Sequence, residues 1–184
     1  MADPIVQRYT ALAEQFGARV EATPDDAWDK PSPCEGWTAR DVLGHVVGGQ
    51  CNVARSITGQ EPAVDLQADP KGAWRSSFEA IKAALDHPGA LEQQVPGPAG
   101  EMTVSDLVGR FLASDVLVHT WDLARTTGGD ERLDAQAVSQ SFSGLEPMDA
   151  MLRRPGVFGP KVEPAEDADE QEQFLNFLGR TTRP

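Results

Sequence analysis

The stretch TVSDLVGRFLASDVLVHTWDLARTTGG, residues 103–129, decides the fold. Its first residue is a threonine, and Asp106 follows three residues later, a spacing typical of the capped start of a helix. The stretch ends on Gly128-Gly129, and glycine commonly terminates helices because it adopts a left-handed backbone at little steric cost. Between these signals the apolar residues recur at the three- and four-residue spacing of a helix. We therefore expect one long helix over residues 104–127.

A second long helix is expected after Thr38, which again has an aspartate, Asp41, three residues later. Its apolar residues continue to about Thr58-Gly59. Three glycines inside it weaken the helix by roughly 1 kcal/mol each relative to alanine. They are tolerable where a neighbouring helix or a ligand approaches closely. These glycines are Gly44, Gly48 and Gly49.

Helical patterns continue on both sides of these two segments, and further helices are expected at residues 5–20, 72–85, 134–152 and 167–178. The connecting segments are rich in proline and glycine, and no alternating strand pattern exceeds four residues. The sequence therefore predicts an all-α protein, a four-helix bundle with short additional helices. We expect one domain over residues 1–184.

Charge and composition exclude several classes of partner. The chain has 29 acidic against 16 basic residues, a formal net charge of −13, so its surface repels phosphate backbones and anionic lipid. Its apolar runs are far shorter than a bilayer span, and its first residues lack a basic segment followed by an apolar one. We therefore expect a cytoplasmic protein that binds neither nucleic acid nor a membrane.

Two cysteines are present, Cys34 and Cys51, and neither belongs to a CxxC pair. A structural zinc site made of thiolates is therefore not expected. Cys34 precedes a helix N-terminus, where a thiolate is favoured, but a structural role in the loop explains it as well. Cys51 is expected to be a small buried residue of the second long helix.

The candidate chemistry lies on the helix of residues 104–127. Asp115, His119 and Asp122 are spaced i, i+4 and i+7, which places them within a strip roughly 60° wide. A carboxylate and an imidazole one turn apart can point at the same ion, and His45 supplies a third ligand if the two long helices pack together. Such donors suit zinc, nickel, iron or manganese. The alternative is that each histidine is an ordinary hydrogen-bonded residue of its helix.

Two segments carry a resemblance to a known family. They are PCEGWTARDVLGHVV at residues 33–47 and DVLVHTWDLA at residues 115–124. They resemble the two signature helices of the DinB/YfiT-like superfamily. Within it, they are most similar to the metal-binding domain of mycothiol-dependent maleylpyruvate isomerase and its actinobacterial relatives. The residues from Val157 to Arg180 also resemble those relatives.

The resemblance implies a helical bundle that binds one divalent metal ion, zinc or alternatively nickel, through three ligands. The matching residues are His45, Asp115 and His119. The isomerase pattern has glutamate where this chain has Asp115, whose side chain is one methylene shorter. Asp122 also matches the pattern, and it either orients an imidazole by accepting its second N–H or is a helix carboxylate without that role.

Two functions follow from the resemblance. One is a metal-dependent thiol S-transferase-like enzyme, with mycothiol as cosubstrate and the metal activating the thiol. The other is a non-enzymatic metal or small-molecule binding module. The isomerase has a further C-terminal domain, and a chain ending at Pro184 has no room for one, so the isomerase reaction itself is not expected. The thiol reaction requires no nucleophile from the protein, and we assign no catalytic side chain. The sequence is also compatible with a homodimer.

Four residues beside these motifs have two interpretations each. Trp37 and Trp121 either pack against their neighbours or contact a substrate. Arg40 and Arg125 either are ordinary surface charges or hold an anionic thiol cofactor.

Overall fold

The computed structural model describes residues 3–98, 100–154 and 157–183, and most of them lie in helices. The all-α class expected from the sequence is confirmed. By compactness the chain divides into two units, Met1–Glu131 and Arg132–Pro184. The single domain over residues 1–184 stays a prediction.

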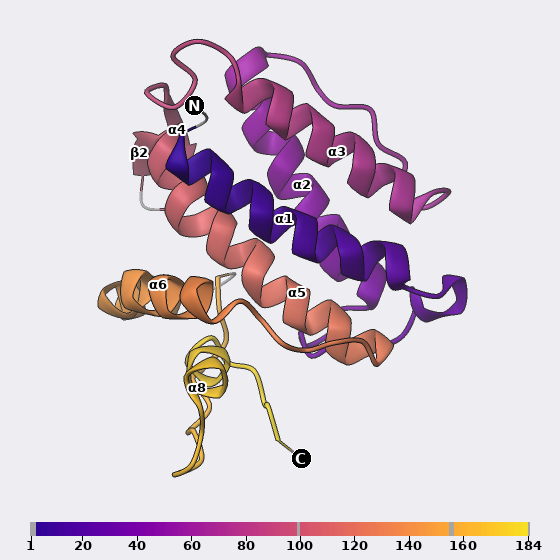
Figure 1. The fold of residues 1–184 in the computed structure, drawn as a ribbon, viewed down its shortest axis with the longest axis vertical. Coiled ribbons are helices and arrows are strands. Elements are labelled where there is room, and N and C mark those ends of the chain that lie inside the picture. Colours follow the sequence, from indigo (N-terminus) through magenta and orange to yellow (C-terminus); the bar gives the residue numbers. More distant parts are fainter. Residues whose placement is uncertain (1–2, 99, 155–156, 184) are drawn as a thin grey trace. The chain divides into compact units, whose positions relative to one another are not determined.

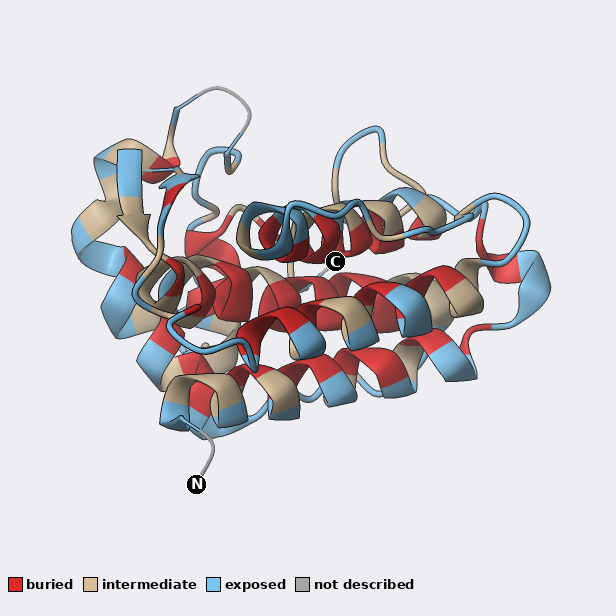
Figure 2. Cartoon of the chain, turned by 90° about the horizontal axis from the view of Figure 1, so that it is seen from above, coloured by how far each residue is buried: buried red, intermediate tan, exposed pale blue. Residues whose placement is uncertain are grey.

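Four long helices make up most of the first unit: α1 (Pro4–Ala22), α2 (Ala39–Thr58), α3 (Pro70–Leu85) and α5 (Ala113–Thr127). Helices α1 and α2 each pack against both α3 and α5 (Figure 1). The buried faces of these helices turn toward one another, and their exposed faces turn outward (Figure 2). The largest fully buried side chains of this unit include Tyr9, Phe16, Leu43, Ile81, Leu117, Trp121 and Leu123.

The start and end of α2 follow directly from its sequence. The Thr38 hydroxyl accepts a hydrogen bond from the Asp41 backbone N–H, and the Asp41 carboxylate accepts one from the Thr38 N–H. This reciprocal pair satisfies two N–H groups that the first helical turn leaves without partners. At the other end, Gly59 has a φ of 73°, the left-handed conformation that glycine adopts freely. The expected bounds of this helix are confirmed.

The helix expected over residues 104–127 is also present, with one irregularity. It begins as α4 (Val104–Asp106), widens into a π-helical segment, η2 (Leu107–Leu112), and continues as α5. In the widened turn the Ala113 N–H bonds to the Val108 carbonyl, five residues back rather than four. The Arg8 guanidinium of α1 donates to the Gly109 carbonyl inside this segment. The widened segment ends at Leu112, three residues before Asp115, and leads into the helix that carries two of the three candidate ligands.

A short hairpin precedes this helix. Strand β1 (Gln94–Gly97) pairs antiparallel with β2 (Gly100–Thr103), which leads directly into α4. Each strand has four residues, no longer than the strand patterns that the sequence allows. Among the described residues of the first unit, the remaining regular element is the single turn η1 (Asp25–Ala27).

The second unit contains α6 (Ala135–Leu145), η3 (Glu146–Met148), α7 (Asp149–Leu152) and α8 (Glu170–Phe177). The sequence predicts one helix over residues 134–152, but the structure interrupts it at η3. Pro147 explains the interruption, because its ring removes a backbone N–H and clashes with the preceding turn. The last helix is also shorter than the expected 167–178.

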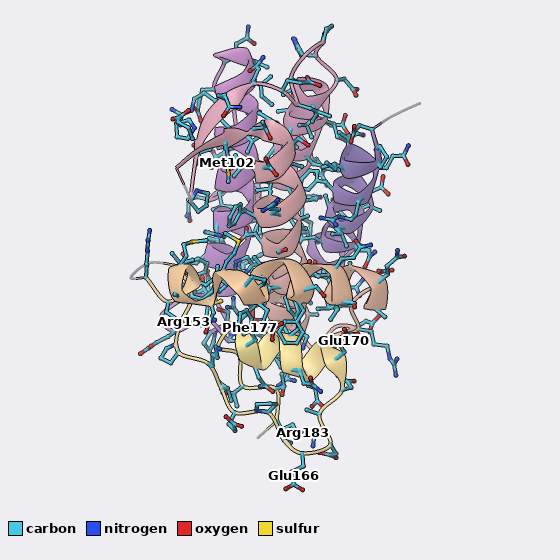
Figure 3. The ribbon with its side chains drawn as sticks, turned by 90° about the vertical axis from the view of Figure 1, so that its left-hand side faces the viewer. Met102, Arg153, Glu166, Glu170, Phe177 and Arg183 are labelled. Atoms are coloured by element: carbon cyan, nitrogen blue, oxygen red, sulfur yellow. The ribbon has the colours of Figure 1, made fainter. Side chains whose placement is uncertain are left out.

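Aromatic side chains form the centre of this second unit. Helix α6 packs against α8, and the Phe142 ring contacts the rings of Phe174 and Phe177. The Arg153 guanidinium lies over the Phe177 ring, 5.1 Å from its centroid, and both residues are labelled in Figure 3. Arg183 forms ion pairs with Asp167, which precedes α8, and with Glu172 in the first turn of α8. No helix among the described residues is both long and apolar enough to cross a membrane.

Candidate metal centre

The candidate ligands come from two helices that pack against each other. His45 lies on α2, whereas Asp115 and His119 lie one turn apart on α5. Because residues four apart share a helix face, the α5 pair projects toward α2 from a single strip. The packing of α2 on α5 therefore completes the set with His45.

One carboxylate oxygen lies between the two imidazoles. Asp115 Oδ1 is 3.0 Å from His45 Nε2 and 3.4 Å from His119 Nε2. The three ligand atoms all lie within 4.8 Å of one another. Tetrahedral bonds of zinc length would place neighbouring N and O ligand atoms about 3.3 Å apart. The residues therefore fit one divalent ion with only small side-chain adjustments.

The site is buried on one side and open on the other. The exposed fraction of the side chain rises from 5% at His119 through 22% at Asp115 to 45% at His45. Trp37, from the loop before α2, lies against both imidazoles, with ring centroids 5.2 Å from His45 and 6.0 Å from His119. Solvent therefore reaches the centre from the His45 side.

Asp122 fixes the orientation of His119. Its carboxylate is fully buried, and Oδ2 accepts a hydrogen bond from His119 Nδ1 over 2.8 Å. The same oxygen lies 3.3 Å from the Cys34 thiol, which donates to it. A histidine held through Nδ1 in this way presents Nε2 toward Asp115, as metal-binding histidines held by a carboxylate generally do.

The electrostatics of the pair Asp115 and His119 follow from this geometry. Burial by itself raises the pKa of Asp115, but the charge and hydrogen bonds of the two histidines outweigh it and hold this pKa well below its usual range. Burial likewise lowers the pKa of His119, but Asp115, followed by hydrogen bonds to Asp122 and Cys34, raises it well above the ordinary value. When no metal is bound, the two carboxylates therefore favour the protonated form of the His119 imidazole.

Comparison with known proteins identifies the family. The mycothiol maleylpyruvate isomerase N-terminal domain family matches residues 9–124. The chain belongs to this family. The resemblance noted in the sequence is thereby confirmed.

Two relatives are uncharacterised proteins of Mycobacterium tuberculosis, from strains CDC 1551 / Oshkosh and ATCC 25618 / H37Rv. Each is 30% identical to this chain over 188 residues, which cover 98% of the chain and 100% of the relative. No solved structure matches the chain. The segment matched by the isomerase N-terminal domain family contains all three candidate ligands and Asp122, and it ends within α5.

The residues singled out from the sequence lie together within this family domain. His45, Asp115 and His119 form one cluster, and Asp122 contacts the Nδ1 atom of His119, on the opposite side of the ring from Asp115. Their role as ligands stays a prediction. Helical periodicity placed the three α5 residues on one face, whereas the meeting with His45 depended on the packing of α2 against α5.

Arg40 and Arg125, the two arginines considered as ligands of an anionic thiol, both bind other groups of the protein. Arg40 donates to the Leu66 carbonyl and pairs with Asp29. Arg125 forms two parallel hydrogen bonds with the Glu131 carboxylate. These contacts favour structural roles for both side chains.

The two cysteines differ in their surroundings. Cys51 is buried on α2, as expected, and burial raises the pKa of its thiol. Cys34 is only half-buried, and its contact with Asp122 spans 88 positions of the sequence. Sequence reasoning missed this contact, since the only signal was the position of Cys34 before a helix N-terminus.

Proposed function

We propose that the chain binds one divalent metal ion through Nε2 of His45, Nε2 of His119 and a carboxylate oxygen of Asp115, and uses it to activate a small thiol. The observation that carries the proposal is the position of Asp115 Oδ1, within 3.4 Å of both imidazole nitrogens. Zinc is the first candidate, with nickel as the alternative, because two imidazoles and one carboxylate suit such borderline ions.

The shorter aspartate side chain is long enough for this role. The family resemblance implies glutamate at this position, yet Asp115 Oδ1 already lies within hydrogen-bonding distance of His45 Nε2 and near His119 Nε2. Its negative charge offsets part of the charge of a divalent ion. His119 releases its Nε2 proton when an ion binds, and Asp122 keeps the ring in place through Nδ1.

Thiol activation is supported by family membership and by access to the site. The family is named for a mycothiol-dependent isomerase. Three protein ligands leave further positions on the ion, and the 45% exposed His45 borders the solvent side. A divalent ion held there would lower the pKa of a bound thiol and so favour its thiolate at neutral pH. The metal-bound thiolate would then be the nucleophile, so no side chain of the protein has to supply one.

Metal content tests the ligand assignment. Protein purified without added metal is analysed alongside the variants His119→Ala and His87→Ala. We expect about one divalent ion per chain in the unchanged protein and in His87→Ala, since His87 lies in the turn after α3. His119→Ala should lose the ion. Unchanged metal content in His119→Ala would overturn the assignment.

The thiol reaction is tested separately. Conjugation of mycothiol to a model electrophile is followed with metal, after chelation and after metal is restored. We expect a rate that depends on the metal and is lost in His45→Ala. Metal binding without such a rate would instead identify the chain as a non-enzymatic binding module, the alternative that the sequence leaves open.

A further inference from the structure

A second group of potential ligands lies on the other side of His119. It consists of the Cys34 thiol, Asp122 Oδ2 and His119 Nδ1. The oxygen is 3.3 Å from the sulfur and 2.8 Å from the nitrogen, and all three atoms lie within 4.8 Å of one another. Tetrahedral bonds of zinc length would place sulfur, nitrogen and oxygen ligands about 3.3–3.6 Å apart. The sulfur–oxygen separation lies in this range, whereas the nitrogen–oxygen separation is a hydrogen-bond distance that an ion would lengthen by about 0.5 Å.

One helix and one loop hold the residues of this group. Asp122 and His119 lie three residues apart on α5, and both side chains are buried. Cys34 lies in the loop before α2, which is closed by a bridge between Pro31 and Thr38 and by a hydrogen bond from the Trp37 N–H to the Cys34 carbonyl. The sulfur is therefore held beside α5 by the backbone of the loop.

The chemistry of these donors differs from that of the first site. The group of His45, Asp115 and His119 has no sulfur ligand and contributes one negative charge. A thiolate at Cys34 and the carboxylate of Asp122 contribute two, which neutralise a divalent ion completely. Sulfur also favours thiophilic ions over harder ones. We propose that Cys34, Asp122 and His119 form a second cation position, which takes a strongly thiophilic divalent ion such as Cd²⁺.

The two positions share His119 and so exclude each other. A neutral imidazole has one lone pair, because its other nitrogen carries a proton. An ion at the second position displaces the Nδ1 proton and the Cys34 thiol proton to solvent, and Nε2 keeps its proton toward Asp115. An ion at the first position binds Nε2 instead, and Nδ1 then keeps its proton toward Asp122. A thiophilic ion bound at the second position therefore removes His119 as a ligand of the proposed thiol-activating site.

Titration with Cd²⁺ tests the second position, because a cadmium–thiolate bond gives an ultraviolet charge-transfer band. The proteins compared are the unchanged chain, Cys34→Ser, His45→Ala and the control Cys51→Ser, which alters the other cysteine. We expect the band in all of them except Cys34→Ser. We expect the Cd²⁺ affinity of Cys34→Ser to fall by more than about 100-fold, since loss of a direct ligand exceeds the effect of losing an outer partner. Cd²⁺ should also displace Mn²⁺ from the unchanged protein.

Two results would overturn the second position: a band that persists in Cys34→Ser, or a band absent from the unchanged protein while Cd²⁺ binds. The His45→Ala variant separates this outcome from failure of the proposed function. If only the second position fails, Mn²⁺ or Ni²⁺ binding still depends on His45. If only the proposed function fails, the Cd²⁺ band remains in His45→Ala and depends on Cys34.

Discussion

At the scale of single residues, the site is organised around His119. Its Nε2 faces Asp115 and its Nδ1 faces Asp122, so each ring nitrogen has a carboxylate partner. The ring is almost fully buried, whereas His45 is nearly half exposed. His119 is therefore the ligand with the least freedom to reorient, and changes at its partners should act through it.

Asp122→Asn should weaken metal binding at the first site although Asp122 does not face that ion. An amide is a poorer acceptor for the His119 Nδ1–H, so the ring is held less firmly and becomes less basic. We expect affinity to fall by about 10–100-fold in competition with a chelator. Asp86→Asn, at the exposed C-cap of α3, is the control and should leave affinity unchanged.

The stability of the metal-free protein should depend on pH through the same residues. The lowered pKa of Asp115 stabilises the fold above about pH 3.9, and this is lost as the pH falls through the folded-state pKa. The raised pKa of His119 stabilises it below about pH 6.5, and this is lost as the pH rises through the folded-state pKa. Both contributions are fully present between these two values.

The melting temperature, measured with a chelator from about pH 5 to about pH 8, should therefore decline above about pH 6.5. In Asp115→Asn the decline should be smaller, because His119 loses the carboxylate that most raises its pKa. An equal decline in both proteins would contradict this assignment of charge.

At the scale of elements, close packing explains some glycines and not others. A Cβ at Gly17 on α1 would lie 2.6 Å from Nε1 of Trp74 on α3. That indole ring lies between Phe16 and Phe78, with centroids 5.0 and 5.3 Å away, and so has little room to move. At Gly48 on α2 a Cβ would meet nothing within 4 Å.

Gly17→Ala and Gly48→Ala should therefore change stability in opposite directions. Alanine gains up to about 1 kcal/mol of helix propensity at both positions. At Gly17 overpacking costs about 1–3 kcal/mol, so a net loss is expected. Urea unfolding measures both effects, and a stabilised Gly17→Ala would show that α1 and α3 can separate freely.

At the scale of the whole molecule, the two compact units could unfold together or separately. The second unit spans only residues 132–184. In chains shorter than about 70–80 residues, a single hydrophobic core rarely supplies enough free energy for a stable fold. All four tryptophans lie in the first unit, at positions 28, 37, 74 and 121. Tryptophan fluorescence therefore reports on the first unit, whereas helical circular dichroism reports on both.

We expect the fluorescence and circular dichroism transitions in urea to coincide, as for a single cooperative domain. Phe177→Trp places a reporter in the second unit and should give the same midpoint. A circular dichroism transition that begins before the fluorescence change would mean that the two units unfold separately.

The sequence by itself determined the long helices and part of the site. Caps such as Thr38 with Asp41, and terminators such as Gly59, act through hydrogen bonds and backbone angles within a few residues. The shared face of Asp115 and His119 is equally local, since it follows from helical periodicity. Local interactions of this kind can be recognised without knowing the fold.

Only the tertiary structure decided which distant residues meet. The approach of His45 to Asp115 depends on the packing of α2 against α5, and the contact of Cys34 with Asp122 depends on the path of a loop. Neither leaves a periodic signal, because contacts between separate elements are set by the packing of all the side chains between them. The first site could be proposed from the sequence through resemblance, whereas the second became visible only in the fold.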